Sequence, residues 1–70
     1  MDKVYEFWYM ENIFEGAPEC ISLHRTKKGA EVAMAYHKEE VKRITIALMG
    51  DNWDWDFGKE WGVREREVEE

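Results

Sequence analysis

Acidic and aromatic residues alternate in one short stretch of this 70-residue chain, GDNWDWDFGKEWG. Carboxylate oxygens such as those of Asp54 and Asp56 are hard ligands of the kind that Ca²⁺ prefers, and Gly58 could provide a sharp turn. Counted from Asp54, however, the glycine stands at position five, whereas the calcium-loop pattern requires it at position six. The neighbouring tryptophans are also too bulky to frame a tight cage. We therefore expect no metal site in this stretch.

The same alternation suits a protein-binding anchor. In an extended backbone, Trp53, Trp55 and Phe57 point to one side of the chain and the intervening aspartates point to the other. Trp is enriched among the residues that contribute most binding energy at interfaces, and flanking carboxylates favour a partner that carries Arg or Lys. The alternative is that this aromatic side is buried within the chain, where it caps the end of the helix and sheet. Both hold if Trp61 lies in the core and one of the loop tryptophans lies outside.

Trp8 is a second candidate anchor. If Tyr5, Phe7 and Tyr9 pack against a helix, Trp8 points to the opposite face of the sheet. That face would also carry Glu6, Ser22, His24, Arg64 and Arg66. One helix cannot cover both faces, so the open face binds a partner, forms a dimer interface or simply exposes one aromatic ring. The residues that we expect to bind a partner are Trp53, Asp54, Trp55, Asp56, Phe57 and Trp8.

Histidine, serine and cysteine give little support for catalysis. His24 follows Ser22 and Cys20 at two-residue spacing, so that one strand face would carry a base and two nucleophiles. Side chains two apart on a strand start some 6–7 Å from one another, and no third group orients the histidine. His37 falls within an apolar helical stripe, where we expect a hydrogen-bonded structural histidine. We assign no catalytic residue and no cofactor.

The chain is acidic overall, and its charge is unevenly distributed. The formal net charge is −6, with −4 on residues 1–20, +3 on residues 21–50 and −5 on residues 51–70. An acidic chain has no general affinity for a phosphate backbone, which argues against direct nucleic-acid binding. The small basic cluster that begins at Arg25 is more typical of a solvated helix entrance. A partner with a basic or mixed surface is the more natural expectation.

Hydrophobic periodicity predicts four elements in the order β-β-α-β. Strands are expected at Lys3 to Met10, at Glu19 to Arg25 and at Trp61 to Val68, because apolar or aromatic residues alternate with polar ones. A helix is expected from about Lys27 to Met49, because an apolar residue or histidine recurs at intervals of three and four. The stripe consists of Ala30, Ala33, Met34, His37, Val41, Ile44 and Leu48. The expected fold is α+β, a three-stranded antiparallel sheet with one long helix packed on one face.

The ends of this helix carry recognisable signals. Thr26 suits the N-cap, because its hydroxyl can accept from a backbone N–H of the first turn. Gly50 suits the left-handed residue that often ends a helix. Ile46 projects almost opposite the apolar stripe, so it is either exposed for a neighbour or drawn in by a deformed last turn. Residues 1–70 are expected to form a single domain.

Size and composition limit how this domain can be stabilised. A chain of 70 residues buries only a small core, and its single cysteine, Cys20, cannot form an internal disulfide. Its ten aromatic residues must provide much of the core, unless self-association adds to it. We see no signal peptide and no apolar run of about 20 residues, so no membrane association is expected. An unpaired cysteine favours a cytosolic location.

The element order resembles that of small acidic inhibitor proteins made by bacterial viruses. The segments that carry the likeness are VYEFWYM, CISLHR, TKKGAEVAMAYHKEEV and WGVREREVE. The group includes inhibitors of host RNA polymerase and anti-CRISPR proteins. The resemblance implies a protein that acts in the host cytoplasm by binding a larger protein, and it transfers no individual site residue.

We therefore expect a small non-catalytic protein that occupies a surface of a larger cytosolic protein and inhibits or modulates it. A nucleic-acid-binding enzyme is one partner with the required basic surface. The principal alternative is a homodimeric structural or regulatory module that pairs through Ile46 and the open sheet face. A nucleic-acid-binding regulator is a third hypothesis.

Overall fold

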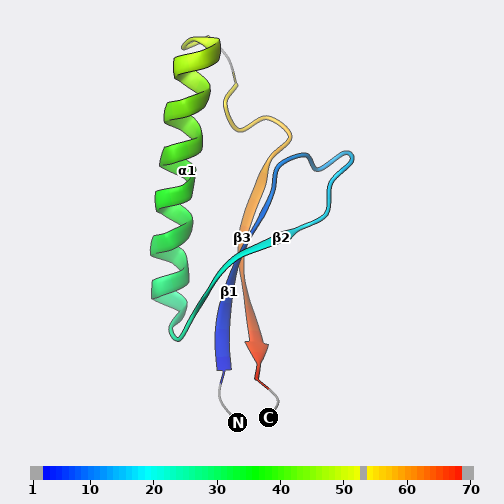
Figure 1. Cartoon of the computed structure of the whole chain (residues 1–70), viewed down its shortest axis with the longest axis vertical. Helices are drawn as coiled ribbons and strands as arrows, with labels where there is room; N and C mark the ends of the chain where they lie inside the picture. The colour runs from blue at the N-terminus through cyan, green and yellow to red at the C-terminus, as the bar shows by residue number, and fades with distance from the viewer. Residues whose placement is uncertain (1–2, 53, 69–70) are drawn as a thin grey trace.

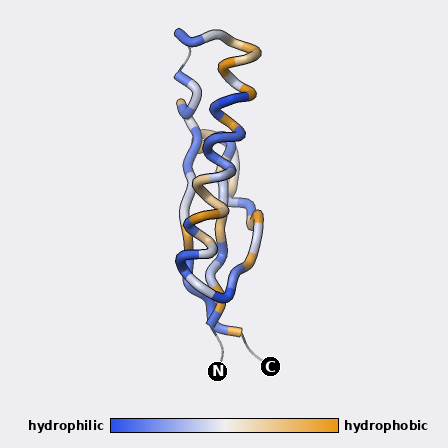
Figure 2. The backbone as a smooth tube through the Cα atoms, turned by 90° about the vertical axis from the view of Figure 1, so that its left-hand side faces the viewer, coloured by the Kyte–Doolittle hydropathy of each residue, from blue (hydrophilic) through white to orange (hydrophobic). Residues whose placement is uncertain are grey.

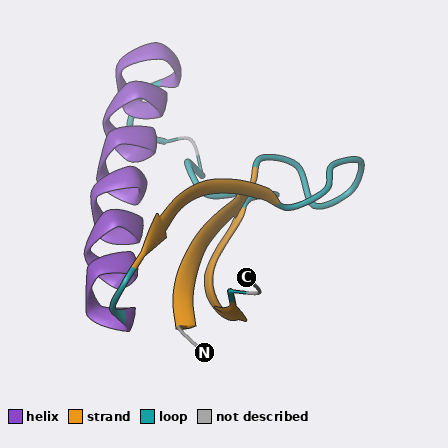
Figure 3. Ribbon diagram, turned by 60° about the horizontal axis from the view of Figure 1, so that its bottom comes forward, coloured by secondary structure: helices purple, strands orange, loops and turns teal. Residues whose placement is uncertain are grey.

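The structure is a computed structural model that describes residues 3–52 and 54–68. Its elements are β1 (Lys3–Met10), β2 (Glu19–His24), α1 (Lys27–Met49) and β3 (Glu60–Glu67), so the predicted β-β-α-β order is confirmed (Figure 1). The strands form one antiparallel sheet in the spatial order β2-β1-β3. The helix lies along one face of this sheet, and no other element covers the second face within the described residues (Figures 1 and 3). The predicted α+β architecture is therefore confirmed.

Strand β1 is central, and its alternation separates the two faces. Phe7 lies opposite Val63 of β3 and contacts the helix through His37, so the odd-numbered residues of β1 face α1. Glu6 lies opposite Arg64, on the other side. We call this other side the open sheet face, which carries Val4, Glu6, Trp8 and Met10 of β1 with Glu60, Gly62, Arg64 and Arg66 of β3.

A bulge in β2 alters which of its residues share a face. Phe7 pairs with Ser22, but the next residue of β1, Trp8, pairs with Cys20, so Ile21 is an extra residue in β2. Ser22 therefore lies on the helix side, and Cys20 lies on the open sheet face. The expectation that Ser22 and His24 share the open face with Cys20 is wrong, because strict alternation fails wherever a strand contains an extra residue.

Thr26 and Gly50 stand at the two ends of α1 as predicted, although Gly50 has a positive φ without the ψ of the left-handed helical conformation. The hydroxyl of Thr26 accepts a hydrogen bond from the backbone N–H of Gly29 at 3.0 Å, as an N-cap does. The helix ends at Gly50, whose backbone N–H donates to the carbonyl of Ile46 at 2.9 Å. Gly50 has φ +88° and ψ 169°, a conformation that glycine adopts readily and side chains resist.

The sheet supports only the first part of the helix. Ala30, in the first turns of α1, is fully buried, and Phe7 of β1 is 1% exposed; of the residues described, these are the two buried apolar side chains. Further along the same stripe, Ile44 is 49% exposed and Leu48 is 77% exposed. Figures 1 and 2 show why: the last turns of α1 extend past the ends of the strands. The end of the apolar stripe is therefore left without cover from the sheet.

His37 joins the aromatic residues between helix and sheet. The indole N–H of Trp61 donates to Nδ1 of His37 at 2.9 Å, and the rings of Phe7 and Tyr9 lie 5.4 and 4.6 Å from the imidazole. Burial lowers the pKa of His37 below its ordinary value of 6.5. The expected structural histidine is therefore present, as the neutral acceptor of a buried indole hydrogen bond.

This arrangement predicts that stability falls as the pH drops below the ordinary histidine pKa of 6.5. The unfolded chain takes up a proton on His37 below pH 6.5, whereas the folded chain resists it because its pKa is lowered. The contribution is complete above pH 6.5 and is lost as the pH falls towards the folded pKa. Urea unfolding at several pH values should show this loss in the wild type and in a His24→Asn control. It should be absent in His37→Asn; an unchanged pH dependence in that variant would contradict the assignment.

Candidate functional site

The acidic-aromatic segment folds into turns and is not extended. The backbone N–H of Phe57 donates to the carbonyl of Asp54, and that of Lys59 donates to Asp56, each at 3.1 Å. Gly58 has a φ of +72°, which bends the chain into β3. The expectation that the aromatics of this segment share one side is therefore wrong, because alternation of side chains requires an extended backbone. Trp53, one of the predicted anchors, lies outside the described residues.

Trp55 faces the interior, whereas the aspartates face solvent. Its ring lies 5.9 Å from that of Trp61, with the planes inclined at 55°, and it is half-buried. Asp54 and Asp56 are exposed. Within residues 3–52 and 54–68, no three His, Cys, Asp or Glu side chains come together as a metal site would require. Trp55 thus extends the core, and its aspartate neighbours remain available to a partner.

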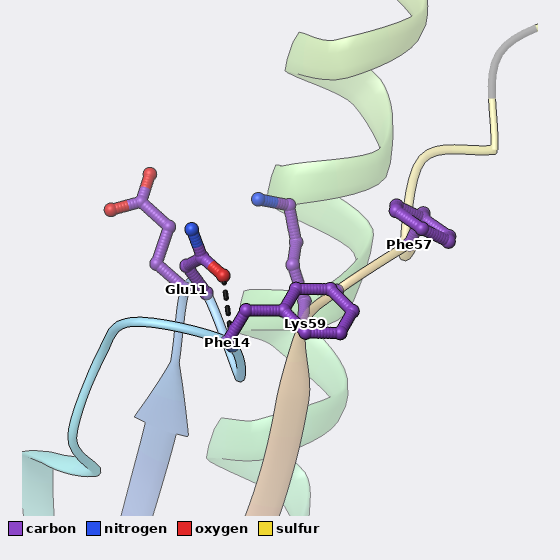
Figure 4. A pocket seen from close by; sticks show the side chains of 6 residues that line it. Glu11, Phe14, Phe57 and Lys59 are labelled. Atoms are coloured by element: carbon purple, nitrogen blue, oxygen red, sulfur yellow. Dashed lines mark hydrogen bonds between the residues drawn. The ribbon is translucent and has the colours of Figure 1, made fainter.

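Phe57 points instead towards a loop that sequence reasoning did not single out. Its ring lies 6.2 Å from that of Phe14, which belongs to the connection between β1 and β2 (Figure 4). Phe14 is 71% exposed and Phe57 is 67% exposed. The backbone N–H of Ile13 donates to the carbonyl of Gly58 at 2.8 Å and ties the two loops together. We call Ile13, Phe14 and Phe57 the loop-end surface.

Local hydrogen bonds hold the first of these loops in shape. The side chain of Asn12 accepts from the backbone N–H of Phe14 at 2.9 Å, which is an Asx turn (Figure 4). The carbonyl of Asn12 accepts from the N–H of Gly16 at 2.6 Å. A Cβ at Gly16 would lie 2.7 Å from that carbonyl oxygen, so the turn closes tightly only with glycine there. Phe14 is therefore presented by an ordered turn.

A shallow hollow adjoins the aromatic pair. It has a volume of about 430 Å³ and is lined by Glu11, Asn12, Phe14, Phe57, Gly58 and Lys59. In Figure 4, the Glu11 side chain extends from the end of β1 and the Lys59 side chain rises from the start of β3 beside the Phe14 ring. The rings thus have a polar surround, which is the usual anatomy of an interface centre with a polar rim.

Trp8, the remaining predicted anchor, belongs to the open sheet face. It pairs with Gly62 in the sheet, and a Cβ at Gly62 would overlap the indole ring of Trp8. The ring therefore lies flat against the backbone of β3 and is half-buried. The structure does not group Trp8 with Phe57 in one aromatic cluster. Trp8 covers part of the face that the helix leaves open.

The centre of the open sheet face is a buried carboxylate. Glu6 is only 2% exposed and accepts from Nε of Arg64 at 3.0 Å and from Nη1 of Arg66 at 3.5 Å. The hydrogen bond from the Cys20 thiol, followed by that from Arg64, holds the pKa of Glu6 below its ordinary value of 4.5. The same thiol–carboxylate hydrogen bond raises the pKa of Cys20. The sequence analysis placed Glu6, Arg64 and Arg66 on one face of the sheet, and the β1–β3 register, which it did not specify, sets Glu6 opposite Arg64 and next to Arg66.

One hydrogen bond resembles part of a catalytic pair. The hydroxyl of Ser22 lies 2.7 Å from Nε2 of His24, on the helix side of β2. Among the described residues, no carboxylate lies within hydrogen-bonding distance of His24 to orient it. Cys20, the second nucleophile considered from the sequence, lies on the opposite face of the sheet. The geometry therefore gives a side-chain hydrogen bond and not an assembled nucleophilic site.

Comparison with known proteins does not identify a family. No helix in the described part of the chain is long and apolar enough to cross a membrane. No family description, no curated protein and no solved structure matches this chain. The functional argument therefore rests on the geometry of the chain itself.

The buried carboxylate gives a testable stability effect. At pH 7, Glu6→Gln should lower the free energy of unfolding by about 1–3 kcal/mol, because charge-assisted hydrogen bonds to arginine are lost. In the wild type this contribution is present above pH 4.5 and is lost as the pH falls through the lowered folded pKa. Chemical unfolding from pH 7 to pH 3 should show that loss in the wild type but not in the variant.

Glu65→Gln is the matched control. Glu65 is half-exposed and its oxygen lies 3.4 Å from the Lys3 ammonium, so its removal should cost no more than about 1 kcal/mol. Alkylation of Cys20 adds a second measurement, because the thiol should react faster when Glu6 no longer raises its pKa. Equal stability losses in both variants would contradict a special role for Glu6.

Proposed function

We propose that this chain is a small non-catalytic binding protein that seats its loop-end surface on a larger cytosolic protein and inhibits or modulates it. The observation that carries the proposal is the exposed Phe14–Phe57 pair, whose ring centroids are 6.2 Å apart. The two side chains come from loops that are distant in sequence, and the Ile13–Gly58 hydrogen bond joins those loops. A core-forming role does not explain why both rings are mostly exposed.

Preorganisation makes this pair suitable as an anchor. Binding costs free energy whenever a loop must be ordered, and that cost is reduced when the loop is already held in place. Here the Asx turn at Asn12 and the hydrogen bond to Gly58 fix the backbone on both sides of the rings. Aromatic side chains buried in a partner's pocket commonly contribute 2 kcal/mol or more each, by truncation to Ala.

Charge indicates the chemistry of the partner. The loop-end surface lies where the two acidic parts of the chain meet, residues 1–20 with net charge −4 and residues 51–70 with net charge −5. Asp54, Asp56 and Glu11 are exposed near the two rings, and Lys59 is the basic residue that lines the hollow. A recess with an apolar floor and an Arg- or Lys-rich rim would complement both features. A nucleic-acid-binding enzyme is one protein class that carries such rims.

The order of elements resembles that of small viral inhibitor proteins. This likeness supports inhibition or modulation of the partner as the result of binding. A bound protein of this size would block the recess it occupies and thereby inhibit or modulate the partner. The proposal places the action in the cytoplasm, the host cytoplasm if a bacterial virus encodes the chain. Trp8 and the acidic β3 strand lie outside the loop-end surface and are not required for this anchor.

Truncating the anchor tests the proposal. A tagged wild-type chain should retain one larger protein from bacterial lysate, whereas Phe14→Ala/Phe57→Ala should weaken that binding at least about thirtyfold, as expected for loss of a hot-spot residue. The double variant should remain folded by circular dichroism and cooperative unfolding, because both side chains are mostly exposed. Asp54→Asn/Asp56→Asn should slow association and reduce its dependence on salt.

Leu23→Ala is the matched control, since it removes a 57% exposed apolar side chain from a different part of the surface. It should bind as the wild type does. If the folded double variant also binds as the wild type does, the loop-end surface is not the anchor and the proposal fails.

A further inference from the structure

The chain exposes more surface than a compact protein of its mass. Its accessible surface is 5626 Å² for 8.4 kDa, whereas the usual scaling for folded monomers gives roughly 4,600 Å². Its radius of gyration is 13.9 Å, against about 11 Å expected for this length. The difference in area, on the order of 1,000 Å², is close to the share that one subunit buries in a standard interface, about 800 Å².

One flank of α1 forms a straight row of side chains that is exposed beyond its first residue, Ala33, which lies partly buried next to β2. The row consists of Ala33, Tyr36, Glu40, Arg43 and Ala47, which alternate at intervals of three and four. Such spacing lines up along one side of a helix and is the pattern of a helix–helix seam. Tyr36, in the row, is 78% exposed. Two shallow hollows follow the row, one beside β2 and the other along the second half of the helix.

We propose that this flank pairs with the same flank of a second copy of the chain, with the two α1 helices antiparallel. A two-fold axis makes such an interface self-complementary, so that residue i faces residue j and residue j faces residue i. With the axis between Glu40 and Arg43, Tyr36 faces Ala47 of the second copy. At both ends of the seam, the large Tyr36 side chain of one copy then meets the small Ala47 side chain of the other.

The charges in the middle of the seam favour the same register. Glu40 faces Arg43 of the second copy, and Arg43 faces its Glu40. Within one chain these two side chains already lie 2.6 Å apart, so the dimer places four alternating charges around the axis. A polar layer at the centre of a seam costs some stability but fixes register and orientation. A parallel pairing would bring Glu40 beside Glu40 and Arg43 beside Arg43, which like-charge repulsion disfavours.

The same register would also cover exposed apolar residues at both ends of the flank. Ile21, at the bulge of β2, is 41% exposed and lines the hollow next to Ala33 and Tyr36. Because Tyr36 faces Ala47 of the second copy, Ile21 lies level with the overhanging end of the other helix. That end carries Leu48, which is 77% exposed. Each copy would thus cover the part of the helix that its partner's own sheet leaves unsupported.

Dimerisation through this flank is independent of the proposed function. The seam uses residues 33–47 of α1, whereas the loop-end surface uses residues 13–14 and 57. Failure of the dimer would leave partner binding through Phe14 and Phe57 untouched, and the reverse also holds.

Charge reversal tests whether the copies pair through this flank. In sedimentation equilibrium over a concentration series, the wild type should reach twice its chain mass of 8.4 kDa. Glu40→Arg alone should stay at the monomer mass, because it places only positive charges at the axis. Arg43→Glu alone should also stay at the monomer mass, because it places only negative charges there. An equal mixture of these two variants should restore a dimer, now with one chain of each kind. Glu31→Arg, on the opposite side of the helix, should dimerise like the wild type.

The outcomes separate the alternatives. A wild type that remains at the monomer mass at every concentration overturns the proposal. A dimer that neither single reversal weakens also overturns it, because the copies then pair through another surface. If both single variants are monomers but the mixture does not associate, residues 40 and 43 do not pair by charge across the seam, and the proposal is overturned. Circular dichroism of each variant checks that a chain found at the monomer mass is still folded.

Discussion

The structure follows from a limit on what one helix can cover. Helix α1 has 23 residues and is therefore about 34 Å long, whereas the eight residues of β1 span about 27 Å. One helix covers a single face of the sheet, and this one also extends past its end. The consequences are a small core around Phe7 and Ala30, an open sheet face and an exposed helix end. Each of these features is a place where a small chain must compensate locally or bind something else.

The open sheet face is stabilised without a second layer. Glu6 is 2% exposed and is surrounded by Arg64, Arg66 and the Cys20 thiol. The guanidinium groups provide the hydrogen bonds that a buried carboxylate requires, and their outer edges remain in solvent. Polar and aromatic side chains thus replace the apolar layer that a larger protein would place there. The interaction surfaces that we propose accordingly lie at the loop end and along the helix flank.

The fold could be predicted because its sequence signals act over a few neighbouring residues. The candidate site could be predicted only in part, because it depends on pairing between residues that are distant in sequence. The alternation in β1 and β3, the helical stripe, Thr26 and Gly50 each act over a few residues, and the structure contains all four elements that they predicted. The bulge at Ile21 depends on how β2 pairs with β1, which alternation within β2 does not encode. Phe14 joined the site because one hydrogen bond connects Ile13 with Gly58, more than forty residues away in sequence. Of the predicted anchors, Phe57 is part of the loop-end surface, whereas Trp55 packs against Trp61 and Trp8 against Gly62.

The central claim is that two exposed rings are the anchor that a partner covers. The chain has three phenylalanines, of which Phe7 is buried and Phe14 and Phe57 are exposed, so fluorine-labelled phenylalanine reports on all three in one ¹⁹F NMR spectrum. In the free protein, a soluble paramagnetic agent should broaden the Phe14 and Phe57 resonances and leave that of Phe7 sharp. Addition of the captured partner should protect both exposed rings from the agent. If they remain as accessible in the complex as in the free chain, the partner binds elsewhere and the account is contradicted.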